Sequence, residues 1–388
     1  MPEPRPFRPR AFLLATWSVN VCINAFYISP APVFPQIIED LDISKAFAGS
    51  LISFYLVSIL LFQLPSGYVM DRTDPRDLIV LSGIVLLALS AAMTAFPSRD
   101  ALLVLRILAG IPVAFIFAPS AFLVSRAFEQ TPGRAVGLFL SAPPAGVAAG
   151  NLLAPSIAQA FGWPWVFVAF NVPLLLVLPL FRRFAASVPP RTHEAFGLSD
   201  FLAAFRNREL WKVGAAFAAS YAAYIFYASW TPTYLTESGI ASAALIGLLA
   251  ASIPAAGILS RPLGGHLAET IFSRDKRRVP ALGLAVLAGV SALVPFLGLT
   301  GLPLLVAAGF FAQFPFSVYY LFSAQVLPRR FGGTAYAFMN TISLVGGAMS
   351  PGLAGLLADV TGSFLAAFAM ISLTALLGLG IVLSVRER

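Results

Sequence analysis

The run LIVLSGIVLLALSAAMTAFPS at residues 78–98 contains no charged side chain, and it decides the class of fold. A helix needs roughly 20 mostly apolar residues to cross the hydrocarbon core of a bilayer, and this run supplies them. The chain has nine further charge-free stretches, which are 11–38, 46–70, 107–125, 135–181, 213–236, 238–260, 279–328, 331–358 and 360–385. The sequence therefore predicts an all-α integral membrane protein.

Two of these stretches are long enough for two spans each. The stretch 135–181 is interrupted at a Gly-Trp-Pro triplet that begins at Gly162, and 279–328 is interrupted near Gly298. Arg261 interrupts a run that otherwise continues, so we extend the eighth span to about residue 268. The chain is thus predicted to cross the membrane twelve times.

The composition excludes several classes of protein. Hydrophobic residues make up 59% of the chain and charged residues 11%, whereas a soluble domain carries about 25% charged residues. With two histidines, His193 and His266, and one cysteine, Cys22, we expect no Cys/His metal cluster and no intrachain disulfide. No HExxH, GxSxG or Walker-type motif is present. We therefore expect a protein that is not an enzyme and has no metal or cofactor.

The distribution of basic residues predicts the orientation in the membrane. If the N-terminus is cytoplasmic, 21 basic residues fall in cytoplasmic segments and only Lys45 and Arg99 fall in outer loops. This bias satisfies the positive-inside rule and explains the net charge of +8 without a nucleic-acid partner. No small-residue cleavage site follows the basic first ten residues, so the first helix is expected to be retained. We expect a multi-pass protein of the plasma or inner membrane with both termini in the cytoplasm.

The two halves of the sequence repeat each other. Offsets of 198 or 199 residues align Gly67 with Gly265, Ala109-Gly110 with Ala308-Gly309, and Gly133 with Gly332. We therefore predict an N-terminal six-helix bundle over 1–183, a cytoplasmic linker over 184–209 and a C-terminal six-helix bundle over 210–388. Repeated halves of this kind place a binding site near the midplane, and access alternates when one half rocks against the other.

The loop GYVMDRTDPR at 67–76 resembles the Gly-x-x-x-Asp-Arg loop of the Major Facilitator Superfamily of secondary transporters. The matching positions are Gly67, Asp71, Arg72 and Arg76. Asp74 and Pro75 replace the family's usual glycine and basic residue. The resemblance covers essentially the whole chain and implies the major facilitator fold, in which two pseudo-symmetric bundles of six helices form the transporter.

Further positions carry the same resemblance. Arg106 and Gly110 in the fourth span are similar to the family's Arg-x-x-x-Gly element, and the second half keeps Gly265 but has Glu269 in place of the aspartate. The resemblance implies that Gly67, Asp71, Arg72, Arg76, Arg106, Gly265 and Glu269 act in gating. Gly67 would allow two helices to approach closely, and Asp71 at a helix end would latch the outward-facing state. The alternative is a plain cytoplasmic loop with solvated charges.

Arg261 is the charge on which the functional hypothesis depends. It lies eight residues before Glu269, which places it about 12 Å into the membrane, and no carboxylate of the sequence lies at a comparable depth. A deep guanidinium needs a partner, and an anionic substrate can supply one. The alternative is that Arg261 binds backbone carbonyls or extends its side chain to the cytoplasmic face.

The surroundings of Arg261 resemble the anion-carrying branches of the family. The string SRPLGG, Ser260 to Gly265, is similar to nitrate/nitrite porters and to monocarboxylate- or oxalate-type carriers. The matching first-half position, an arginine in nitrate porters, is Gln63, and Asn151 resembles the Gly-Asn element of those porters. Oxalate-type carriers have a lysine in the eleventh span, where this chain has uncharged residues such as Asn340. One cation therefore suits a monovalent anion.

Polar residues recur at helical spacing in the first, seventh and tenth predicted spans, which contain Asn20, Tyr224 and Gln313 respectively. A polar stripe that faces lipid is unfavourable, so these residues are expected either to line a cavity or to bond between helices. Together with Arg261, the predicted substrate-binding residues are Asn20, Asn24, Tyr27, Gln63, Asn151, Tyr224, Tyr227, Gln313, Tyr320 and Asn340.

The sequence thus predicts a monomeric secondary transporter for a small anion, with the lipid bilayer as its surroundings. Two alternatives remain. One is an exporter of amphipathic or cationic compounds, which the 13% aromatic content favours and the missing buried acid disfavours. The other is a transporter-like ligand sensor, against which the absence of an added signalling domain counts.

Overall fold

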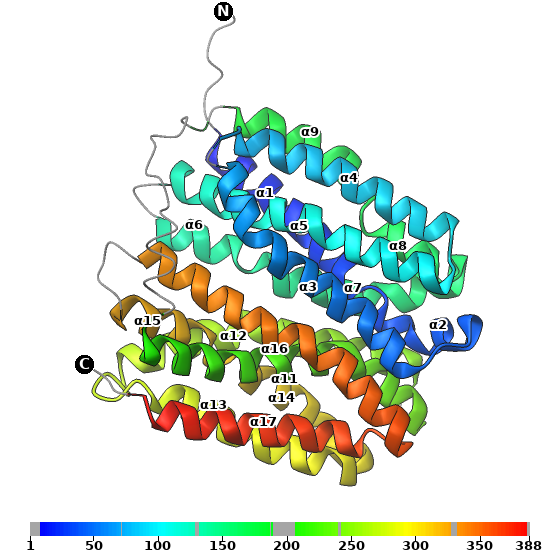
Figure 1. The fold of residues 1–388 in the computed structure, drawn as a ribbon, viewed down its shortest axis with the longest axis vertical. Helices are drawn as coiled ribbons and strands as arrows, with labels where there is room; N and C mark the ends of the chain where they lie inside the picture. The colour runs from blue at the N-terminus through cyan, green and yellow to red at the C-terminus, as the bar shows by residue number, and fades with distance from the viewer. Residues whose placement is uncertain are drawn as a thin grey trace, which may run out of the picture. The chain divides into compact units, whose positions relative to one another are not determined.

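A computed structural model describes residues 8–70, 72–128, 132–186, 188, 206–239, 242–326 and 332–385. These residues are helical almost throughout, and none of them forms a β-strand (Figure 1). Contacts divide the chain into two compact units, one of residues 1–30 and 54–195 and the other of residues 31–53 and 196–388. We call them the N-terminal and C-terminal units.

The N-terminal unit contains α1 and most of α3, followed by six further helices. α1 spans Pro9–Ile28, and α3 spans Lys45–Met70 and enters this unit at Phe54. The others are α4 (Pro75–Ala95), α5 (Arg99–Ala127), α6 (Pro132–Phe139), α7 (Ala142–Phe161), α8 (Trp165–Ala169) and α9 (Leu174–Ala185).

The C-terminal unit begins with segment 31–53, which holds the 3-10 turn η1 (Ala31–Val33), α2 (Phe34–Leu41) and the first part of α3. Its remaining elements are α11 (Arg208–Ser238), α12 (Ala243–Glu269), α13 (Arg278–Leu293), η2 (Val294–Phe296), η3 (Gly298–Gly301), α14 (Leu302–Gln313), α15 (Phe316–Val326), α16 (Gly332–Thr361) and α17 (Leu365–Leu383). Within it, α13 and α17 run side by side (Figure 1).

The units differ in one respect from the predicted division at 183 and 210. Residues 31–53, which the sequence assigns to the first bundle, group with the C-terminal residues. Most of the predicted linker 184–209 lies outside the described residues. The six-plus-six division of the chain therefore stays a prediction.

The described residues contain eleven helical segments that are long and apolar enough to cross a membrane. The predicted span 213–236 is not among these eleven segments. It falls in α11, which has 31 residues but carries several tyrosines, serines and threonines that lower its mean hydropathy. The predicted interruption at Gly162 is confirmed, because α7 ends at Phe161 and Gly162 has a φ of 92°, a conformation that favours glycine. The interruption near Gly298 coincides with the 3-10 turns between α13 and α14.

Small residues bring α1 and α7 into close contact in the N-terminal unit. A Cβ atom on Gly146 would collide with the carbonyl of Val21, and one on Gly150 would collide with the side chain of Ile28. In a membrane, helices associate through close packing because lipid is as apolar as leucine. The glycines of the fifth span therefore serve helix packing.

Candidate functional site

Arg261 lies on α12 and is half-buried within the C-terminal unit. One terminal nitrogen donates to Oε1 of Gln313 at 2.7 Å, and the guanidinium lies over the ring of Phe316, 4.9 Å from its centroid. The Nε atom is buried and makes no hydrogen bond with the described residues. Among these residues no carboxylate pairs with Arg261. The side chain is thus held on one side, and its buried Nε donor has no partner among these residues.

Gln313 ends α14 and is fully buried beside α12. Its Nε2 donates to the backbone carbonyls of Ile253 at 3.0 Å and Gly309 at 3.1 Å, so both ends of the amide have partners. Ser317 on α15 donates to the backbone carbonyl of Arg261 at 2.8 Å. The backbone around Arg261 is therefore fixed to α15.

Aromatic side chains surround the guanidinium. The ring of Phe316 lies 5.8 Å from that of Tyr221 and 6.2 Å from that of Tyr224, both on α11. Arg261 is near enough to both tyrosines to interact with them electrostatically. The structure thus brings together three predicted residues, Arg261, Tyr224 and Gln313. Sequence analysis missed Tyr221 and Phe316, although Tyr221 lies one helical turn before Tyr224.

The other predicted residues of this unit have different surroundings. The Tyr227 hydroxyl lies 2.9 Å from that of Ser291 on α13, and its ring packs against Phe368 on α17. Tyr320 packs edge-on against Phe217 with 5.2 Å between ring centroids. Asn340 is half-buried on α16, where its backbone carbonyl accepts a hydrogen bond from Ser343.

The predicted residues of the N-terminal unit are engaged mostly in local contacts. The side-chain amides of Asn20 and Asn24 donate to carbonyls four residues earlier, at 2.9 and 2.8 Å. Tyr27 stacks on Tyr55 with 5.5 Å between centroids, and Asn151 is buried on α7. Gln63 is half-buried, and its amide oxygen has no hydrogen-bond partner among the described residues.

The loop between α3 and α4, which the sequence predicts to be cytoplasmic, is described in part, and Asp71 lies outside the described residues. Arg72 is exposed and lies over the ring of Tyr68. Arg76 pairs with Asp74 at 2.9 Å and donates to the carbonyls of Ala185 and Ala186 at the end of α9. Partial burial raises the pKa of Asp74, but the hydrogen bonds from Arg76 outweigh it and lower the pKa below its ordinary value.

The remaining predicted gating residues are spread over both units. Arg106 is completely buried in the N-terminal unit, where it donates to the carbonyls of Phe26 at 3.2 Å and Tyr27 at 2.5 Å. A Cβ atom on Gly67 would have no neighbour within 4 Å among the described residues, so these residues do not show the close approach expected there. On α12, a Cβ on Gly265 would lie 3.3 Å from that of Ser317, and Glu269 is exposed at the helix end.

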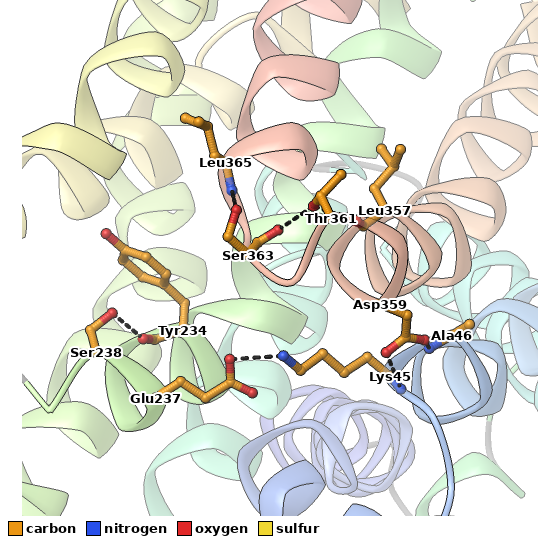
Figure 2. A network of polar contacts seen from close by, with 10 residues as sticks. All are labelled: Lys45, Ala46, Tyr234, Glu237, Ser238, Leu357, Asp359, Thr361, Ser363 and Leu365. Atoms are coloured by element: carbon orange, nitrogen blue, oxygen red, sulfur yellow. Dashed lines mark hydrogen bonds and ion pairs between the residues drawn. The ribbon is translucent and has the colours of Figure 1, made fainter.

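A polar network joins segment 31–53 to the rest of the C-terminal unit (Figure 2). Asp359 of α16 accepts hydrogen bonds from the backbone N–H groups of Lys45 at 3.0 Å and Ala46 at 2.7 Å, so it caps the start of α3. The Lys45 ammonium reaches the other way, to Glu237 of α11 at 2.9 Å. Sequence analysis used Lys45 only as a topology marker, because both acids are far away along the chain.

Backbone packing extends this contact along α3. A Cβ atom on Gly49 would collide with the carbonyl of Pro351, and one on Gly355 would collide with the carbonyl of Lys45. Ser53 accepts a hydrogen bond from the N–H of Gly352 at 3.0 Å. Residues 45–53 are therefore closely bound to α16.

Long apolar helices, repeated halves and a half-buried cation are the features of a multi-pass membrane transporter. The family model described as Major Facilitator Superfamily matches residues 16–351, and the chain belongs to this family. The fold class and the family predicted from the sequence are thereby confirmed.

Relatives and solved structures are similar over most of the chain. The hexuronate transporter of Bacillus subtilis (strain 168) is 24% identical over 358 residues, which cover 86% of this chain and 84% of that protein. The cyanate transport protein of Escherichia coli (strain K12) is 23% identical over 366 residues, 91% of each chain. The structure of a bacterial homologue of the human lysosomal transporter Spinster has a TM-score of 0.77 at 17% identity, with 98% of this chain and 95% of that chain covered.

Proposed function

We propose that this protein is a secondary transporter that moves a small monovalent anion by rocker-switch alternating access, with Arg261 as the receptor for the negative charge. The observation that carries the proposal is the buried Nε of Arg261, a donor without a partner among the described residues. A buried donor left unpaired is unfavourable, and the cost is larger when the group is charged. An anionic oxygen of a substrate would satisfy it.

The charge balance at Arg261 supports a single negative charge on the substrate. Gln313, Tyr221, Tyr224 and Phe316 are its described neighbours, and all are uncharged at neutral pH. Hexuronate and cyanate, after which two of the relatives are named, are both monovalent anions, and this supports the same class of substrate here. We further propose a monomer in the plasma or inner membrane. The positive-inside bias supports an orientation with both termini in the cytoplasm.

Substitution of Arg261 by glutamine tests this function. In proteoliposomes we expect counterflow of labelled cyanate, glucuronate or nitrite by the wild type, and a decrease of about 10- to 100-fold in Arg261→Gln. This range corresponds to the roughly 1.5–3 kcal/mol of a hydrogen bond to a charged group. Arg278→Gln is the matched control, because it removes an exposed cation from the same unit.

Two further labelled compounds, oxalate and ethidium, separate the proposed function from that of a multidrug exporter. Oxalate reports on divalent anions and ethidium on cationic dyes. Dye counterflow that survives Arg261→Gln, together with no anion counterflow by the wild type, would overturn the anion proposal and favour the exporter.

A further inference from the structure

We infer that Gln313 is a positioning residue that orients the Arg261 guanidinium toward the substrate, rather than a residue that contacts the substrate itself. This inference rests on the proposed function of Arg261. Gln313 is fully buried, and each end of its amide already has a protein partner. Both N–H bonds of the amide are thus used, so Gln313 has no donor left for an anionic substrate, although the sequence placed it among the predicted binding residues.

The orientation of the Gln313 amide follows from its neighbours. Its Nε2 faces two carbonyl oxygens, those of Ile253 and Gly309, which only a donor can satisfy. Oε1 therefore faces α12 and accepts from the terminal nitrogen of Arg261 at 2.7 Å. The carbonyls fix the amide, and the amide in turn fixes one side of the guanidinium. The buried Nε, which has no partner among the described residues, is the donor that we assign to an anion.

A glycine one turn before Arg261 makes room for this contact. A Cβ atom on Gly257 would collide with Oε1 of Gln313, so any larger residue there must displace the amide that holds Arg261. Gly257 thus acts on the guanidinium through Gln313. Sequence analysis assigned no role to it, because the need for glycine appears only when α12 and α14 are packed together.

The uncharged amide also preserves the full charge of Arg261. A glutamate at position 313 would be of similar size, but its carboxylate would neutralise the guanidinium and would face two carbonyl oxygens. An electrostatically neutral site attracts an anion weakly. The choice of glutamine over glutamate is therefore a determinant of anion specificity.

A double-mutant cycle on Arg261 and Gln313 tests the inference. The variants are Gln313→Leu, Arg261→Gln and the double variant, and the readout is the KM and maximal rate of counterflow. The probe is whichever of cyanate, glucuronate and nitrite the wild type exchanges fastest. We expect Gln313→Leu to raise KM about tenfold with little change in maximal rate. In the Arg261→Gln background the same substitution should have almost no further effect, because no guanidinium remains to be oriented. Substrate-induced shifts in thermal unfolding give the affinities if counterflow of the double variant is too slow.

Three further variants complete the design. Gln313→Glu should raise KM as much as Arg261→Gln does, and Gly257→Ala should raise it in the same direction as Gln313→Leu. Gln159→Leu, which replaces an exposed glutamine of α7, is the control and should match the wild type.

A wild-type KM in Gln313→Leu, or additive losses in the cycle, would overturn the positioning role while leaving the function of Arg261 intact. A wild-type KM in Arg261→Gln would instead overturn the proposed function.

Discussion

Replacement of Arg106 by leucine is expected to lower the stability of the detergent-solubilised protein by about 3 kcal/mol or more. The guanidinium donates to the carbonyls of Phe26 and Tyr27 at the end of α1 and lies over the rings of Phe26 and Tyr55. Each hydrogen bond to a charged group contributes roughly 1.5–3 kcal/mol, and the cavity left by the smaller side chain adds to the loss.

The environment of Arg106 explains why a conservative replacement should also be harmful. The planar guanidinium reaches two carbonyls of neighbouring residues at once, whereas a lysine ammonium is a single point charge on a flexible stem. We therefore expect Arg106→Lys to lie between the wild type and Arg106→Leu. The measurement is the midpoint of thermal unfolding. It is monitored by the fluorescence of a thiol-reactive dye, which labels the buried Cys22 when the protein unfolds.

Arg99 provides the control for this prediction, because it is the exposed first residue of the same helix. Arg99→Leu should change the unfolding free energy by no more than about 0.5 kcal/mol. Equal midpoints for Arg106→Leu and the wild type would show that the two carbonyl contacts contribute no net stability.

Arg106 also shows what the sequence can and cannot predict. Its position inside a span and its resemblance to a family element were visible in the sequence, and from them we predicted a gating role, which stays a prediction. Its carbonyl partners lie about 80 residues earlier in the chain. Periodicity reports which face of a helix is polar, but it does not report which helix packs against that face.

The same limit applies to the candidate site. The helical class and most of the spans follow from charge-free runs, because the cost of charge in hydrocarbon acts on every residue separately. The depth of Arg261, read from the same runs, stays a prediction. The division of roles between Gln313 and Tyr224 depends on which side chains meet between helices. Both lie on polar stripes and look equivalent in the sequence, yet Gln313 is fully bonded within the protein, whereas Tyr224 lies beside Arg261 and Phe316.

Segment 31–53 leads to the second prediction with a large effect, which concerns how access to the proposed site alternates. α3 starts at Lys45 in the C-terminal unit and continues beyond Ser53 into the N-terminal unit. If the units rock against each other, either this helix bends at the boundary or residues 45–53 separate from α16. Residues 51–57, LISFYLV, span the boundary and contain neither glycine nor proline, the residues at which helices commonly bend. We therefore expect separation.

A disulfide across this contact should accordingly stop transport. In a Cys22→Ser background, Ala46→Cys and Asp359→Cys place two thiols on neighbouring residues. In the structure the backbone N of Ala46 lies 2.7 Å from the Asp359 carboxylate. We expect oxidation to reduce counterflow to less than about a tenth of the rate before oxidation, and a reducing agent to restore it. The unoxidised pair reports separately on the loss of the Asp359 cap.

A second pair of cysteines shows whether the arrest comes from preventing this movement or from oxidation itself. Thr361 donates to the carbonyl of Ser363 at 2.9 Å within one turn at the end of α16, so Thr361→Cys with Ser363→Cys joins residues that have no reason to separate (Figure 2). Oxidation of that pair should leave counterflow unchanged. Exposed ion pairs such as Lys45 with Glu237 are weak enough to break and reform during a transport cycle, whereas a covalent bond is not. Unimpaired counterflow in the oxidised Ala46–Asp359 pair would therefore mean that α3 bends at the boundary between the units while residues 45–53 stay on α16.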